Sequence, residues 1–386
     1  MFWKGMSLKL KILIAPDSFK GSLSSKEVCS AIKKGINRVS KYNFDIIEVP
    51  IADGGEGTVE SFIIAVGGKI VDVNVTGPLG HTVKAYYGIL NDGTAIIEMA
   101  AAAGLYLVPN ELRNPLKTTT YGVGELIKSA LDHGCRKFII GIGGSATNDG
   151  GAGMAQALGV KLIDKNGNEI NFGGEHLNKV EKIDLSGIDR RIYESEFIVA
   201  SDVNNPLCGV NGASYIFGPQ KGATTEMIKI LDDNLIHYAE VIKNAIGKDL
   251  SKIPGAGAAG GLGFGLMAFL NATIKPGIEV IIEVARLEDK VKDCDIVMTG
   301  EGNTDYQTAF GKAPSGIVKL AHKYNKPVII LSGGLGFNYK KLYDIGTTAL
   351  FSIVDKPMTL EEAMENAYEL IADRSEDLIR TLLALK

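Results

Sequence analysis

Both ends of the chain show short apolar runs that alternate with helix-like segments. Residues 10–15 and 44–49 are apolar runs, and each leads into a polar loop and then into a segment with apolar positions at helical spacing. A capping box of Ser24 and Glu27 marks the start of the first helix. This alternation predicts strands and helices in turn, as in a parallel sheet covered on both faces.

The last hundred residues repeat this form. Three apolar runs, at 295–299, 328–332 and 349–354, lead into two glycine-containing loops and a long C-terminal helical stretch. Ligands of such sheets bind beyond the carboxyl ends of the strands, so the loops after these runs should open on one edge. We therefore predict a doubly wound, flavodoxin- or Rossmann-like α/β domain, built from both chain termini (residues 1–75 and 287–386).

The middle of the chain has a different pattern. Strand-like runs joined by glycine-containing turns over 71–100 predict an antiparallel meander. Buried strands are predicted at 137–142 and 197–203, and a hairpin around Asn166-Gly167. We expect residues 76–286 to form an inserted mixed α/β domain, with the active-site cleft between the two domains.

Composition excludes several classes of protein. The chain has 386 residues, of which 45% are hydrophobic and 22% are charged, as in a globular protein with a buried core. A formal net charge of −4 gives no basic face for nucleic acid. No stretch has the apolar length of a membrane span, and the first residues show no secretory signal, whether Met1 or Met6 is the start.

The four cysteines are scattered without a CxxC pair, so neither a zinc site nor a disulfide framework is expected. We expect a cytoplasmic protein with a small-molecule substrate and no nucleic-acid or membrane partner. A homodimer is compatible with the sequence.

Two glycine-rich segments match the sequence patterns of nucleotide-binding loops. Residues 255–260 match G-x-G-x-x-G, but no apolar strand precedes them, so a flexible loop that feeds a packed helix is expected. Residues 141–146 follow a predicted strand and match the G-x-G-x-x-A variant. The loop continues through Gly151, longer than a dinucleotide turn, and its glycine and hydroxyl residues favour anion binding at a helix start. A tight packing turn is the alternative. No P-loop sequence occurs.

Carboxylates and lysines gather in the loops beyond the predicted strands. Phosphoryl transfer needs anion donors, Mg²⁺ held by carboxylates, and a group that orients the attacking hydroxyl. Each of these residues alone could be a helix cap or a solvated loop charge, but together they indicate a phosphoryl-transfer site. They are Asp17, Lys20, Asp53, Glu56, Asp202, Glu301, Asp305 and Lys312.

Long segments in chain order resemble the type I glycerate kinase family. They are APDSFKGSLSS (15–25), PIADGGEGT (50–58), RNPLKTTTYGVGE (113–125), GIGGSATNDGGAG (141–153), SDVNNPLCGVNGASYIFGPQKGA (201–223), PGAGAAGGLGFGL (254–266) and TGEGNTDYQTAFGK (299–312). The resemblance implies a two-domain enzyme that uses ATP and a divalent cation to phosphorylate D-glycerate. For bacterial members it implies the 2-hydroxyl, with 2-phosphoglycerate and ADP as products.

The roles of individual residues are inferred from their chemistry. We expect catalytic roles for Asp17, Lys20 and Asp202, and Mg²⁺ binding by Asp202 and Glu301. Substrate binding is expected of Ser18, Asp53, Arg113 and Thr119. ATP binding is expected of Gly143, Gly144, Ser145, Thr147, Glu301, Asp305 and Lys312.

Two other functional classes stay open on the residues alone. A hydroxy-acid dehydrogenase would use the pattern at 141–146, although no acidic residue is well placed for the ribose. A non-catalytic ligand sensor would not need so many carboxylates at one edge. Among kinases, other sugar acids such as tartronate are alternative substrates.

Overall fold

The computed structural model describes residues 10–384, apart from 41, 53, 56 and 312. The chain divides into two compact units. Unit 1 comprises Met1–Asp53, Glu60–Val66 and Gly277–Lys386, and unit 2 comprises Gly54–Val59 and Gly67–Pro276. The predicted division into a discontinuous domain, 1–75 with 287–386, and an inserted domain, 76–286, stays a prediction.

Unit 1 contains a five-stranded, wholly parallel sheet in the order β2-β1-β11-β12-β13. Taken in chain order this is 2-1-3-4-5, the flavodoxin-like order, whose ligand position lies where the winding reverses, between β1 and β11. The doubly wound prediction is therefore confirmed. The strands are β1 (Leu10–Ile14), β2 (Phe44–Glu48), β11 (Ile296–Thr304), β12 (Val328–Leu335) and β13 (Ala349–Ser352).

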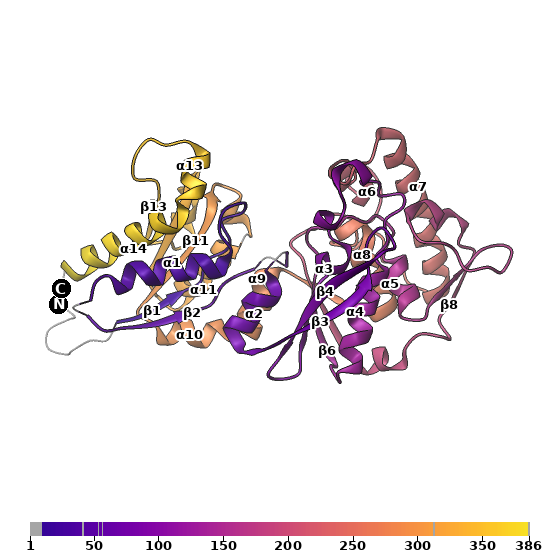
Figure 1. The fold of residues 1–386 in the computed structure, drawn as a ribbon, viewed down its shortest axis with the longest axis horizontal. Coiled ribbons are helices and arrows are strands. Elements are labelled where there is room, and N and C mark those ends of the chain that lie inside the picture. The colour runs from indigo at the N-terminus through magenta and orange to yellow at the C-terminus, as the bar shows by residue number, and fades with distance from the viewer. Residues whose placement is uncertain (1–9, 41, 53, 56, 312, 385–386) are drawn as a thin grey trace. The chain divides into compact units, whose positions relative to one another are not determined.

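Helices cover both faces of this sheet. Ile12 and Met298 point into one apolar cluster with α1 (Ser25–Asn37) and α14 (Ala367–Ala384), which lie side by side in Figure 1. Their strand neighbours alternate to the other face, where α10 and α11 contact β1 and β11. The remaining helices of unit 1 include α9 (Gly277–Val284), α10 (Leu287–Asp293), α11 (Ala313–Lys323), α12 (Lys341–Asp344) and α13 (Leu360–Glu365). Helix α2 (Thr58–Val66) begins in unit 2 and continues in unit 1.

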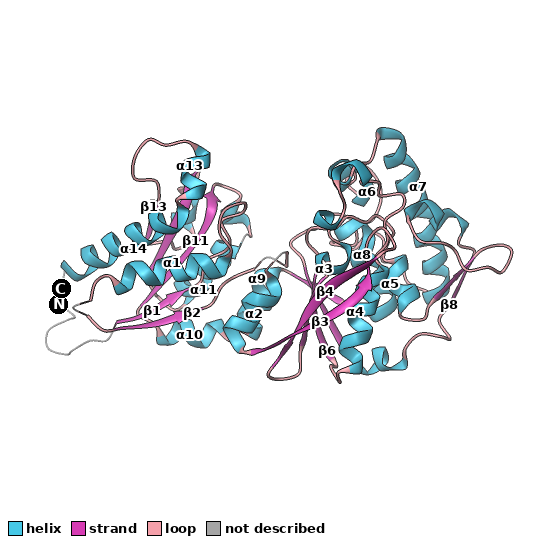
Figure 2. Ribbon diagram, in the orientation of Figure 1, coloured by secondary structure: helices cyan, strands magenta, loops and turns pink. Residues whose placement is uncertain are grey.

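Unit 2 is built on a six-stranded mixed sheet in the order β3-β4-β5-β6-β9-β10 (Figure 2). Strands β3 to β5 pair antiparallel, which confirms the predicted meander, and β5 to β10 pair parallel. The strands are β3 (Gly68–Thr76), β4 (Thr82–Leu90), β5 (Ala95–Glu98), β6 (Lys137–Gly141), β9 (Glu196–Ala200) and β10 (Thr273–Lys275). A separate pair joins β7 (Lys161–Ile163) to β8 (Lys182–Asp184).

The helices of unit 2 pack around this sheet. They are α3 (Ala100–Ala103), α4 (Tyr121–Asp132), α5 (Ala152–Ala157), α6 (Ala213–Phe217), α7 (Thr225–Ile246) and α8 (Ala258–Leu270). Short 3₁₀ turns are η1 (Leu105–Leu107), η2 (Asn110–Leu112), η3 (Gly174–Lys179), η4 (Arg190–Glu194) and η5 (Pro219–Lys221), with η6 (Thr308–Phe310) in unit 1. None of the described helices is long and apolar enough to cross a membrane.

One local prediction was wrong and another was confirmed. Strand β11 does not end before Gly300 but continues through Thr304, with Glu301 opposite Ser332 of β12. The two strands approach closely here because glycines leave room: a Cβ on Gly300 would lie 2.1 Å from the carbonyl oxygen of Leu331. The predicted hairpin around Asn166-Gly167 forms: Ile163 pairs antiparallel with Glu169, and the Ile170 N–H donates to Leu162 O at 2.9 Å, while β7 also pairs with β8.

The glycine-rich segment 255–263 is buried rather than a loose loop. Three consecutive residues, Ala259, Gly260 and Gly261, have positive φ within the first turns of α8. A Cβ on Gly260 would lie only 1.9 Å from the carbonyl oxygen of Thr147, and the Gly260 carbonyl accepts the Gly150 N–H at 3.0 Å. Absence of side chains therefore lets this segment pack directly on the backbone of the loop after β6.

Candidate active site

In unit 1, predicted site residues meet at the point where the winding of the sheet reverses. The loop after β1 is held to β11 by backbone hydrogen bonds from Ala15 N–H to Met298 O (2.8 Å) and from Asp17 N–H to Gly300 O (2.9 Å). The next β11 residue is Glu301, and both carboxylates are largely buried, with Asp17 8% and Glu301 6% exposed. Two acidic side chains are thus placed on neighbouring strands at the ligand edge.

A hydroxyl group connects Glu301 with Asp305. Thr308 Oγ1 donates to Glu301 Oε1 at 2.5 Å and accepts the Asp305 N–H at 3.2 Å. The Asp305 carboxylate accepts the Gln307 N–H at 2.8 Å, which shapes the turn after β11. Thr308 therefore fixes the orientation of one carboxylate and the start of the loop that carries the other.

Ser18 and Lys20 belong to the same loop as Asp17. The Ser18 N–H donates to Asp17 Oδ1 at 2.6 Å, and the half-buried Ser18 is followed two positions later by an exposed Lys20. A Cβ on Gly302 would lie 3.5 Å from the Lys20 backbone nitrogen, so β11 runs directly beside this loop. Asp53, Glu56 and Lys312, also predicted for the site, lie outside the described residues.

In unit 2, the loop between β6 and α5 occupies the carboxyl edge of the sheet. Gly54 packs there too: its carbonyl accepts the Gly143 N–H at 3.1 Å, and a Cβ on Gly54 would lie 2.5 Å from Ala200 O. The backbone of Gly54 is therefore seated at the ends of both β6 and β9. Asp202 is exposed two residues beyond β9, at this same edge.

This loop, residues 143–149, presents backbone donors. The N–H groups of Gly143 and Ala146 bond to backbone carbonyls, whereas none of the hydrogen bonds found among the described residues uses the N–H of Gly144, Ser145 or Thr147. Gly144 is exposed and has φ +72°, and the loop ends at the start of α5. Unused amides beside an exposed glycine are suited to bind an anion, so anion binding by this loop stays a prediction that its geometry allows.

We expect Gly144→Val to lower turnover by about a hundredfold, because a branched side chain would obstruct close approach of an anion. The added Cβ would meet only the Ala100 methyl at 3.6 Å, so the cost to the fold is mainly the positive φ. Gly134→Val is the matched control, since Gly134 has φ +86° with nothing within 4 Å and lies away from the loop. Equal kcat/KM in the two folded variants would make the loop a packing turn.

Asp149, the last residue of the 143–149 loop, is fully buried and accepts several hydrogen bonds. It accepts hydrogen bonds from the backbone N–H and the hydroxyl of Thr120, both at 2.8 Å, and from the Gly151 and Gly153 N–H groups. Burial raises the pKa of Asp149, while these hydrogen bonds act in the opposite direction. The carboxylate thereby connects the start of α4 with the start of α5.

Arg113 and Thr119, predicted to bind substrate, also lie in unit 2. Arg113 is half-buried, with its backbone packed against Gly222, and its Nε is buried without a partner among the described residues. Thr119 is almost fully buried and accepts the Tyr121 N–H at 3.2 Å, a structural contact at the start of α4. Their substrate roles stay predictions, and Arg113 is the better placed of the two.

The sequence did not single out the buried charged residues Glu98, Asp149 and Lys221 as site residues. Glu98, at the end of β5, accepts the Val59 N–H of α2 at 2.7 Å. Asp149 and Lys221 are 0% and 2% exposed. Asp149 and Lys221 lie in two of the segments that resemble the kinase family, 141–153 and 201–223. For Glu98 the available signal is a carboxylate at the end of the apolar run that forms β5.

Mg²⁺ binding stays a prediction from the chemistry of the carboxylates. Among the described residues, no three His, Cys, Asp or Glu side chains gather as ligands. Mg²⁺ commonly takes one or two carboxylates and completes its shell with phosphate oxygens and water, so the carboxylates of Asp202 and Glu301 fit it. Asp202 belongs to unit 2 and Glu301 to unit 1, so their shared role remains a prediction.

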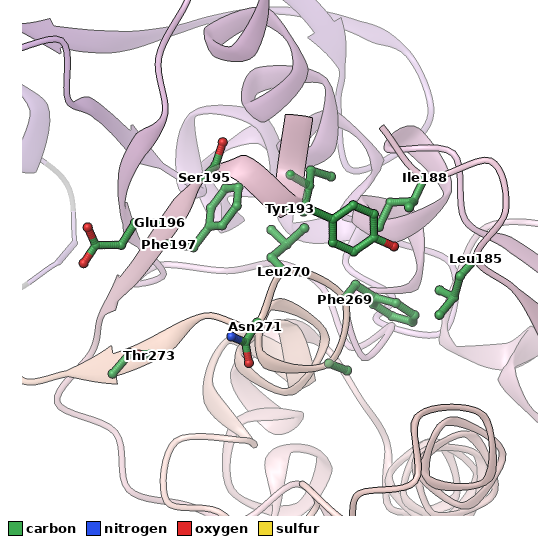
Figure 3. A pocket seen from close by; sticks show the side chains of 12 residues that line it. Leu185, Ile188, Tyr193, Ser195, Glu196, Phe197, Phe269, Leu270, Asn271 and Thr273 are labelled. Atoms are coloured by element: carbon green, nitrogen blue, oxygen red, sulfur yellow. The ribbon is translucent and has the colours of Figure 1, made fainter. Parts of the chain in front are cut away.

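A cavity of about 470 Å³ lies at the other end of the unit 2 strands (Figure 3). Its lining includes Glu196 and Thr273, the first residues of β9 and β10, together with the aromatic rings of Tyr193, Phe197 and Phe269. Because it lies at the amino ends of these strands, it is separate from the edge that carries Asp202 and the 143–149 loop.

Comparison with known proteins decides the family. The sequence model described as "Glycerate kinase family" matches residues 12–383. The chain belongs to this family. The glycerate 2-kinase of Escherichia coli K12 is 54% identical over 374 residues, which cover 97% of this chain and 98% of that protein. The glycerate kinase of Bacillus subtilis 168 is 49% identical, covering 98% and 99%.

A solved structure from Salmonella typhimurium LT2, named as a glycerate kinase 2, matches with a TM-score of 0.88 and 49% identity. The match covers 98% of this chain and 99% of the Salmonella chain. Membership of the glycerate kinase family confirms the resemblance and makes this protein a kinase. The dehydrogenase and sensor alternatives are set aside, because the family match spans nearly the whole chain.

Proposed function

We propose that this protein transfers the γ-phosphoryl group of ATP to the 2-hydroxyl of D-glycerate, giving 2-phosphoglycerate and ADP. The observation that carries the proposal is the near full-length similarity to the E. coli glycerate 2-kinase, whose name specifies that position. The carboxylates at the reversal point of the unit 1 sheet and the unused amides of the 143–149 loop support it, because phosphoryl transfer needs both kinds of group.

We assign roles to residues of both units on the basis of their chemistry. Lys20 follows the negative charge of the phosphoryl group or of the glycerate carboxylate, and Asp17 or Asp202 orients the attacking hydroxyl. Ser18, Arg113, Thr119 and Asp53 bind glycerate. The 143–149 loop, with Gly143, Gly144, Ser145 and Thr147, binds an anionic group of ATP together with Glu301, Asp305 and Lys312.

Asp202 and Glu301 would hold Mg²⁺. When bound, the cation neutralises charge on the phosphate oxygens. The protein's own contribution is to orient these carboxylates, as Thr308 does for Glu301 through its 2.5 Å hydrogen bond.

The test is a coupled assay of ADP release with purified protein, ATP, Mg²⁺ and D-glycerate, beside L-glycerate and tartronate. We expect D-glycerate to give the highest kcat/KM, and no turnover after chelation of the cation. Phosphorus–proton coupling in the product then distinguishes the two hydroxyls. Coupling to the methylene protons would refute the 2-hydroxyl assignment, and absence of ADP with every small hydroxy acid would refute the kinase assignment.

We also propose that the protein acts in the cytoplasm on small molecules. Its four cysteines are free, and Cys29, Cys135 and Cys294 are buried, which suits a reducing compartment. A homodimer remains a prediction, which light scattering of the purified protein measures directly.

A further inference from the structure

One buried cation of unit 2 has no role in the proposal above. Lys221 ends η5 and is 2% exposed. Its ammonium group donates to the carbonyl oxygen of Thr147 at 2.7 Å, a neutral partner. Lysine is almost never fully buried unless it is paired, since desolvation of the charge is costly. A neutral carbonyl does not offset that cost, so a role for the charge is indicated.

The bond to Thr147 orients one peptide group of the 143–149 loop. In a trans peptide the C=O and the following N–H point in opposite directions. Because Lys221 fixes the Thr147 carbonyl, the N–H of Asn148 is directed away from Lys221. None of the hydrogen bonds found among the described residues uses that N–H, although Asn148 is 1% exposed.

Other polar atoms at this place also lack partners. Thr147 Oγ1 and Asn148 Oδ1 are buried without a hydrogen-bond partner among the described residues. Leaving a buried polar atom unsatisfied costs about 1–3 kcal/mol. Such atoms next to one buried ammonium therefore indicate a place that is completed by a bound polar group.

The surroundings of Lys221 allow its amine to be either neutral or protonated near neutral pH. Burial lowers the pKa of Lys221 to about 7, while the carboxylate of Asp149 acts in the opposite direction. Asp149 is itself engaged by Thr120 and by the Gly151 and Gly153 N–H groups, so it is a distant rather than a direct partner. An anion that binds at the loop would add negative charge close to the amine and favour its protonated form.

We propose that Lys221 is a positioning residue, which holds the 143–149 loop from behind and takes up a proton from solvent when an anionic ligand binds the loop. The inference rests on the proposed function, because that function supplies the anions: the carboxylate of D-glycerate or the phosphates of ATP. It adds a coupling between proton binding and ligand binding.

The sign of the pH dependence follows from the lowered pKa. At pH 6 the free protein already carries the proton, so binding takes up almost none. At pH 8 the amine is mostly neutral in the free protein, since its pKa is about 7, and binding takes up as much as about 0.9 of a proton per ligand. Affinity for that ligand consequently weakens as the pH rises above 7.

The experiment is calorimetric titration with D-glycerate, and separately with MgATP, in buffers that differ in ionisation enthalpy, at pH 6 and pH 8. We expect the wild type to show uptake at pH 8 with at least one of the two ligands. Lys221→Met should show none, and Lys221→Arg should bind without uptake, because arginine stays charged. Lys229→Met, an exposed lysine of α7, is the matched control and should behave as wild type.

The wild-type titrations suffice if the Lys221 variants do not fold. No difference in uptake between pH 6 and pH 8 with either ligand would overturn the proposal, and so would unchanged uptake in folded Lys221→Met. ADP release by the same wild-type preparation separates this outcome from failure of the kinase assignment. Normal turnover without proton uptake would refute the role proposed for Lys221 and leave the kinase assignment intact.

Discussion

Lys20→Met is expected to lower kcat by about a hundredfold or more, comparable with removing one preorganised donor from a transition state. Lys20 is exposed in the loop after β1, beside β11 and next to the reversal point of the unit 1 sheet. An ammonium group on a flexible stem there can follow charge as it moves from ATP to the acceptor. Methionine keeps the length of the side chain but removes the charge, so steady-state kinetics report the charge.

The kinetic pattern discriminates between two roles of Lys20. A role limited to the glycerate carboxylate predicts a raised KM for glycerate with kcat largely kept. Lys26→Met is the matched control, because Lys26 is an exposed lysine at the start of α1 in the same unit. Wild-type kinetics in well-folded Lys20→Met would remove Lys20 from the active site.

Gly260→Ala is expected to destabilise unit 2 by about 2–5 kcal/mol. The residue has φ +67°, which costs an L-residue about 1–2 kcal/mol, and overpacking adds about 1–3 kcal/mol. The new methyl would lie 1.9 Å from the Thr147 carbonyl oxygen, a backbone atom that cannot rotate away. Because the same carbonyl accepts the Lys221 hydrogen bond, turnover should fall as well.

Gly167→Ala separates backbone strain from packing. Gly167 has φ +83° but nothing within 4 Å of its added Cβ, so it carries the strain alone. Urea unfolding of the two variants should show a clearly larger loss of unfolding free energy for Gly260→Ala. Equal losses would mean that the 143–149 loop moves freely, contrary to the close backbone packing on α8.

The unit 1 fold was predictable because its central strands, β1, β11 and β12, are mainly buried on both faces. Such strands are continuous apolar runs, and Asp17 directly follows one of them, so its place at the sheet edge could be inferred. The limits of β11 could not, because Gly300 and Gly302 look like turn residues in sequence. Only the close approach of β12 shows that missing side chains are needed there for pairing.

The unit 2 part of the site was less predictable. Lys221 lies between Gln220 and Gly222 in a polar turn, where a lysine is normally exposed, and no local pattern shows that its side chain alone is buried in η5. The carbonyl oxygen of Thr147, which accepts the hydrogen bond of its ammonium group, lies 74 positions earlier in the chain. Long-range burial of this kind depends on the packing of α6, α7 and α8 and leaves no periodic signal.

The β1–β11 pairing has a consequence for synthesis on the ribosome. The Lys11 N–H bonds to Asp295, 284 positions later, at the centre of the unit 1 sheet. At ordinary elongation rates about 15–60 s pass between the emergence of these two strands. Unit 2 lies between them in the chain and can fold during that interval. Strands β1 and β2 then lack β11, the strand that pairs with β1 on its other side. We therefore expect nascent chains that have emerged from the ribosome up to about residue 280, but not as far as β11, to hold a folded unit 2 and a protease-sensitive, chaperone-accessible N-terminal segment.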